Sequence, residues 1–148
     1  MKSTIPQKSK ATCTSSIEDL YKKTQDWVAE IEFIKIEQQF LKELLAEHII
    51  ELCESDNFNK AKLLLKGIDH ENILGNDLLI SIDDHNVNLS LLIENIYLKR
   101  EADFRKNHEL IEVEVTNYIQ NFRYIKEQIY ELVLLIMKNN KKHHMLSN

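Results

Sequence analysis

Residues 15–54 have the sequence SSIEDLYKKTQDWVAEIEFIKIEQQFLKELLAEHIIELCE. Mostly apolar residues recur along it at alternating steps of four and three, the spacing of one face of a helix. The recurring positions are Leu20, Thr24, Trp27, Ile31, Ile34, Gln38, Leu41, Leu45, His48 and Leu52. A capping-box pattern, Ser15-Ser16-Ile17-Glu18, precedes the first of them. The pattern predicts a helix over about 16–54, followed by a turn at residues that favour turns and N-caps.

Two later segments repeat this spacing. The second has Ala61, Leu65, Ile68, Asn72, Gly75, Leu79, Ile82, Asn86, Leu89, Ile93 and Ile96 on its seam, and the third has Ile111, Val115, Tyr118, Phe122, Ile125, Ile129, Leu132 and Ile136. They predict helices over about 58–102 and 107–139. The seam slips by one residue between the two segments, which predicts a turn at 103–107 with Asp103 and Asn107 as candidate N-caps.

Long helices joined by short polar turns lie antiparallel to their neighbours. The sequence therefore predicts an all-α protein, an elongated antiparallel three-helix bundle or coiled coil over 15–140. The alternative is a four-helix bundle with a break at 67–75, because Gly67 and Gly75 each weaken a helix by about 1 kcal/mol relative to Ala. Residues 1–14 are expected to be a disordered leader, and 141–148 a disordered tail.

The composition narrows the class of protein. A chain with 43% hydrophobic and 29% charged residues is typical of a globular domain, and its net charge of −5 disfavours nucleic-acid binding. No uncharged apolar run is long enough for a membrane span, and no apolar stretch follows the first lysines as in a secretory signal, so a cytoplasmic protein is expected. Cys13 and Cys53 lack the spacing of a disulfide framework or a zinc site.

The sharpest hypothesis for chemistry is a ferritin-like or hemerythrin-like metal site, because helical bundles hold metal ions with Glu and His from facing helices. The chain has six His. With turns near 56 and 105, His48 falls level with about residue 64 and His108 with about residue 102, while Glu71 and His85 only flank the seam. The histidine side chains are then dispersed along the bundle and do not meet at one level. The sequence therefore predicts no catalytic, metal or cofactor site, and the metal-binding bundle stays the alternative.

Four polar residues interrupt the apolar seams: Thr24, Gln38, Asn72 and Asn86. A buried polar side chain destabilises the fold unless it is hydrogen-bonded, and single polar seam residues are known to fix helix register. The predicted register places Gln38 near Asn72, and Thr24 near Asn86. We expect all four to be core residues that set alignment. A small-ligand pocket around Thr24, Trp27 and Asn86 is the alternative.

The second helix is apolar on nearly all sides, more than two neighbouring helices can cover. Its predicted partner-binding residues are Leu64, Ile73, Leu78, Ile80, Val87, Leu91, Leu92 and Leu98. The sequence therefore predicts a non-enzymatic helical interaction or scaffold protein, which acts as a homodimer or through a helical protein partner.

Overall fold

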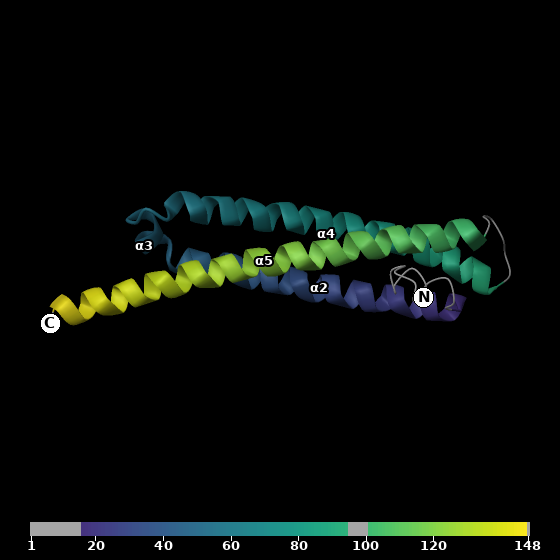
Figure 1. Cartoon of the computed structure of the whole chain (residues 1–148), viewed down its shortest axis with the longest axis horizontal. Coiled ribbons are helices and arrows are strands. Elements are labelled where there is room, and N and C mark those ends of the chain that lie inside the picture. Colours follow the sequence, from purple (N-terminus) through teal and green to yellow (C-terminus); the bar gives the residue numbers. More distant parts are fainter. Residues whose placement is uncertain (1–15, 95–100, 148) are drawn as a thin grey trace, which may run out of the picture. The chain divides into compact units, whose positions relative to one another are not determined.

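The computed structural model describes residues 16–94 and 101–147. It contains the helices α2 (Ile17–Glu47), α3 (Ile49–Cys53), α4 (Phe58–Ile93) and α5 (Glu101–Ser147), shown in Figure 1. No strand occurs in these two ranges. The predicted all-α, helical-bundle class is confirmed. The expected leader, residues 1–14, lies outside the described residues.

Helix α2 begins where its sequence provides a cap. The side-chain Oγ of Ser16 accepts a hydrogen bond from the backbone N–H of Asp19 at 3.1 Å. This bond satisfies one of the N–H groups that the first turn of a helix leaves without a partner. Glu18 and Asp19 in that turn add negative charge at the positive end of the helix dipole.

The predicted first helix is not continuous. α2 ends at Glu47, and the short helix α3 follows after His48, whose backbone angles (φ −108°, ψ 21°) are not helical. The N–H of His48 bonds to the carbonyl of Leu45 at 3.2 Å, a tighter step than that of an α-helix. After α3, the hydroxyl of Ser55 donates to the carbonyl of Leu52 at 3.1 Å. The polar residues that follow form the turn before α4.

Helix α4 runs without a break through both of its glycines. The four-helix alternative, with a break at 67–75, is therefore wrong on this point. At Gly67 a methyl group in place of the hydrogen would lie 3.2 Å from Cδ1 of Ile125 on α5. The close approach of α5 gives this glycine a packing role that outweighs its weak helix propensity.

Helix α5 begins earlier than the seam predicts. The expected turn at 103–107 lies inside α5, which starts at Glu101 and continues to Ser147. Asp103 is not an N-cap but one of two acidic residues in the first turn, where the helix dipole favours a negative charge. The buried stripe of α5 starts at Phe104 and His108, before the predicted first position, Ile111. The predicted turn at 103–107 is therefore wrong, since α4 ends at Ile93 and α5 has already begun at Glu101.

The buried face of α4 also differs from the predicted seam. The residues that are predicted and buried are Ala61, Ile68, Gly75, Ile82 and Leu89, whereas Glu71, Leu78, His85 and Leu92 are buried in place of their C-terminal neighbours. The predicted seam and the observed buried face both have steps of three and four. The helix is therefore rotated about its axis relative to the prediction. A helix that packs against two neighbours buries a stripe wider than a two-position seam, so the seam alone does not fix this rotation.

The chain divides into two compact units. Unit 1 comprises Met1–Glu32 and Gly75–Asn117, and unit 2 comprises Phe33–Leu74 and Tyr118–Asn148. Each has its own apolar core built from α2, α4 and α5; in unit 1, for example, Leu20, Leu89, Leu92 and Phe104 form one cluster. Full burial of one such side chain stabilises the fold by about 1.5–3 kcal/mol. None of the helices in residues 16–94 and 101–147 has the length and apolar character that crossing a membrane requires.

Candidate functional site

The most distinctive polar site lies in the core of unit 1 and consists of two imidazoles, here called the histidine pair. Nε2 of His85 on α4 lies 3.0 Å from Nδ1 of His108 on α5. Both side chains are buried, each with 1% of its surface exposed. Nδ2 of Asn107 lies 3.2 Å from Nδ1 of His85 and extends the chain of hydrogen bonds. The histidine pair joins α4 to α5 inside an apolar core, and the exposed Asn107 extends this polar contact to the surface.

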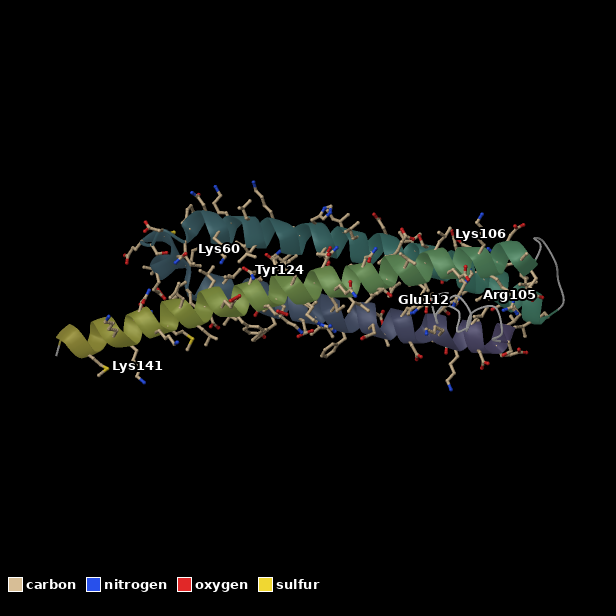
Figure 2. All side chains as sticks on the ribbon, viewed as in Figure 1. Lys60, Arg105, Lys106, Glu112, Tyr124 and Lys141 are labelled. Atoms are coloured by element: carbon tan, nitrogen blue, oxygen red, sulfur yellow. The ribbon has the colours of Figure 1, made fainter. Side chains whose placement is uncertain are left out.

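Trp27 of α2 covers the histidine pair. Its ring centroid is 4.7 Å from that of His108, at an interplanar angle of 34°. Beside it, the ammonium of Lys23 on α2 lies 3.3 Å from the carboxylate of Glu112 on α5. Figure 2 labels Glu112 together with Arg105, also on α5. The site is therefore enclosed by an aromatic ring and an ion pair.

The surroundings of His108 disfavour a positive charge on its ring. Burial is the largest cause that lowers the pKa of His108 from 6.5 to about 4, and the positive charges of a protonated His85, of Lys23 and of Arg105 contribute to the same shift. A cation in this position would lose its hydration and face other positive groups. His108 is therefore uncharged at neutral pH.

A groove of about 410 Å³ runs beside His85 on the surface of unit 1. Its lining residues are Ser81, Asp84, His85, Val87, Asn88, Asn107, Ile111 and Glu114. Most of these are polar, and two are acidic. The groove brings solvent close to the outer side of His85 and to Asn107.

Unit 2 holds a second buried polar layer, formed by Gln38 of α2, Glu71 of α4 and Tyr118 of α5. Nε2 of Gln38 donates to the hydroxyl of Tyr118 at 3.3 Å. Oε1 of Gln38 and Oε1 of Glu71 are buried without a hydrogen-bond partner. Burial raises the pKa of Glu71, an effect that the charge of His70 partly opposes. Burial also raises the pKa of Tyr118 to about 12.

The predicted polar seam residues divide into two cases. Thr24 is fully buried, and its hydroxyl contacts the side-chain amide of Asn86 and the carbonyl of Tyr21, as expected for residues at one level. Gln38 is buried, but Asn72 is exposed and accepts a hydrogen bond from Lys35 at 2.9 Å. Glu71 takes the core position that the sequence gives to Asn72. That these residues set helix register stays a prediction.

The predicted partner-binding residues do not share one environment. Leu78 and Leu92 are buried in the core of unit 1 by other helices of the chain, so the prediction that they face a partner is corrected. Leu64 and Leu91 are half-buried, and Leu98 lies outside the described residues. Ile73, Ile80 and Val87 are exposed by 59%, 64% and 55%.

A second exposed group on α2 was not predicted. Phe33, Ile36 and Phe40 of unit 2, here called the apolar row, are 61%, 68% and 53% exposed. They lie three and four residues apart and therefore share one side of the helix. The sequence contains this spacing, but the stronger seam on the same helix conceals it.

No three His, Cys, Asp or Glu side chains are placed to hold one metal ion within the part of the chain that the structure describes. The histidine pair has two such groups. Cys53 is a free, exposed thiol. Cys13 and the side chains of His143 and His144 lie outside the described parts of the structure. Around Thr24, Trp27 and Asn86, the described residues form a hydrogen bond and a packed aromatic contact.

The sequence analysis missed the histidine pair because it placed the second turn too late. Because α4 ends at Ile93 and α5 begins at Glu101, His108 lies level with His85, whereas a turn near 105 would put it level with residue 102. Comparisons with protein-family models, with curated proteins and with solved structures give no match.

Proposed function

We propose that this protein is a non-enzymatic helical interaction protein that works through self-association or by binding a partner helix. The observation that carries the proposal is the apolar row on α2, which exposes two phenylalanines and an isoleucine. Burial of apolar surface stabilises an association by about 25 cal/mol per Å² before the costs of association are subtracted. A contiguous exposed row of this kind is typical of an interaction site.

The spacing of the apolar row supports a helix as the partner. Phe33, Ile36 and Phe40 stand at positions i, i+3 and i+7, the anchor spacing by which helices dock in apolar grooves. Ile34 and Leu41 of the same helix are buried in the core of unit 2. Helix α2 thus has two apolar faces, and its own unit buries one of them.

The charged residues near the row also favour docking. Glu37 beside the row is neutralised by Lys126 of α5, whose Nζ lies 3.1 Å from the carboxylate. Lys35 and Lys42 bond instead to Asn72 and Asp69 on α4, at 2.9 and 3.0 Å. A partner that covers the row would therefore meet Glu37 and Lys42 already paired with opposite charges and Lys35 hydrogen-bonded to an amide, which lowers the cost of covering them.

Helix α4 offers further apolar surface. In unit 1, Ile80 and Val87 are seven residues apart and therefore lie on one side of the helix, two turns from each other. Both belong to the residues that the sequence predicts for partner binding. They support the same class of function, although the row on α2 contains larger side chains.

The experiment compares Phe33→Glu/Phe40→Glu with the wild type by sedimentation velocity over a range of concentrations. Leu63→Glu is the matched control, because Leu63 is 68% exposed and belongs to the same unit, but lies on α4. We expect the double substitution to weaken self-association at least tenfold, and the control to leave it unchanged.

If the wild type is monomeric at all concentrations, the partner-helix form is tested by quantitative recovery of the proteins that bind to the wild type, the double substitution and the control. A protein whose recovery falls tenfold with the double substitution, but not with the control, would support it. The proposal is wrong if neither self-association nor any bound protein depends on the row while circular dichroism shows that all variants are folded.

A further inference from the structure

The histidine pair has a defined order of protons. Nδ2 of Asn107 donates to Nδ1 of His85, so that nitrogen carries no proton, and a neutral His85 then carries its proton on Nε2. The Nε2–H of His85 donates in turn to Nδ1 of His108. The arrangement therefore requires Nδ1 of His108 to be unprotonated.

We infer that the histidine pair is an acid-sensitive latch, which holds α4 against α5 in unit 1 at neutral pH and releases them when His108 binds a proton. A proton on Nδ1 of His108 would point at the Nε2–H of His85, and the hydrogen bond between the helices would be lost. The buried ring would also become a cation. Both effects favour a state in which His108 reaches water.

The charged groups around the pair favour release. From α2, Lys23 acts on His108 through its positive charge, and so does Arg105 from α5, although its Nε also lies 2.9 Å from the carboxylate of Glu101. Glu112 on α5 is the nearby acid that could offset a proton, but its carboxylate lies 3.3 Å from Lys23. Asp84 on α4 and Glu114 on α5 line the groove beside His85. The side of the pair toward Lys23 and Arg105 therefore disfavours a proton, and the groove gives an opened His85 access to solvent.

The direction of the pH effect follows from the two states of His108. The unfolded or opened ring binds a proton near its ordinary pKa of 6.5, whereas the pKa of the buried ring is lowered to about 4. The opened state therefore binds more protons between these values, and closing becomes less favourable as the pH falls. Across this range, the opening equilibrium should rise by roughly 100-fold or more.

The test measures hydrogen exchange of wild-type protein between pH 7 and pH 4, corrected for the intrinsic pH dependence of exchange, together with the emission of Trp27. We expect exchange in 78–92 and 104–115 to rise by roughly 100-fold on acidification, with a change in Trp27 emission, since its ring lies against His108. In His108→Gln, whose side-chain oxygen can still accept from His85, the rise should be at least tenfold smaller.

The matched control is His70→Gln, an exposed histidine of unit 2, which should leave the acid response of unit 1 unchanged. If His108→Gln does not fold at pH 7, imidazole nitrogen resonances of the wild type decide. They should show an unprotonated Nδ1 on His108 down to about pH 4–5, with release accompanying protonation. The inference is overturned if His108 titrates near 6.5 while α4 and α5 stay protected, or if protection and Trp27 emission do not respond to acid.

Discussion

The buried polar side chains of unit 1 and unit 2 are satisfied to different degrees. In unit 1, His85 and His108 are 3.0 Å apart and hydrogen-bonded. In unit 2, Gln38 donates to Tyr118 over 3.3 Å, while one oxygen of Gln38 and one of Glu71 have no partner. A buried polar atom without a partner destabilises a fold by about 1–3 kcal/mol. The polar layer of unit 2 is therefore the less stable of the two at neutral pH.

The two layers also respond to pH in opposite directions. Because the pKa of His108 is lowered from 6.5, unit 1 loses stability as the pH falls below that value. Because the pKa of Glu71 is raised from 4.5, the folded carboxyl holds a proton that the unfolded chain releases. The contribution of this proton to the stability of unit 2 is present below pH 4.5 and is lost as the pH rises through the raised pKa of Glu71. Acid weakens the polar layer of unit 1, and rising pH weakens that of unit 2.

The largest effect that tests this contrast is expected from Trp27→Ala. Removal of a ring that is 6% exposed and packed on His108 should lower the free energy of unfolding by about 3–5 kcal/mol. It should also make the acid response of unit 1 smaller, because water then reaches His108 and its pKa returns toward 6.5. Urea unfolding followed by circular dichroism measures both effects. Phe40→Ala, an exposed aromatic on the same helix, should change stability by less than about 1 kcal/mol.

A smaller effect of opposite sign is expected in unit 2. Glu71→Leu removes a buried carboxylate with an unpartnered oxygen, and should raise the free energy of unfolding at pH 7 by about 1–3 kcal/mol. Glu71→Gln should give part of this gain and remove the loss of stability with rising pH. Urea unfolding from pH 4 to pH 8 measures both variants. A loss of stability in both would mean that Glu71 has a favourable partner in solution.

The smallest effect is expected from Tyr118→Phe. At pH 7 this change removes one hydrogen bond at 3.3 Å and should destabilise the fold by about 1 kcal/mol. The pKa of Tyr118 is raised from 10.0 to about 12, so the wild type should lose stability between these pH values, as the unfolded phenol ionises and the folded one does not. The variant should lack that loss. If thermal unfolding shows the same dependence of stability on pH between 10 and 12 for the variant and the wild type, Tyr118 has no raised pKa and the prediction is wrong.

The helices were predictable because a repeat of three and four residues, sustained over several turns, has few other physical causes. The proximity of Thr24 to Asn86 was predictable for the same reason, since the turn between their helices lies at a polar cluster after Cys53. Counting residues outward from such a turn tells which residues of the two helices lie at the same level. The register of α2 against α4 was therefore within reach of the sequence.

The histidine pair was not predictable in this way. Its register depends on where the second turn lies, and the slip of the seam between Leu89 and Ile111 does not locate the turn within that interval. The rotation of α4 was also ambiguous, because the set at 71, 78, 85 and 92 and the set one residue later each contain two apolar and two polar residues. The choice depends on which neighbours the helix packs against, and local spacing does not contain that information.

Gly67 limits how this protein can vary. A methyl group there would lie 3.2 Å from Cδ1 and 3.8 Å from Cγ1 of Ile125, and the end of this flexible side chain can shift by a few tenths of an ångström, so alanine is tolerable at this position. A branched or aromatic side chain has no such space and would move α5 away from α4 along that part of unit 2. The size of residue 67 thus limits how closely the two helices can pack. Among natural variants this position should accept only the smallest residues, whereas exposed positions of the same helix should accept many.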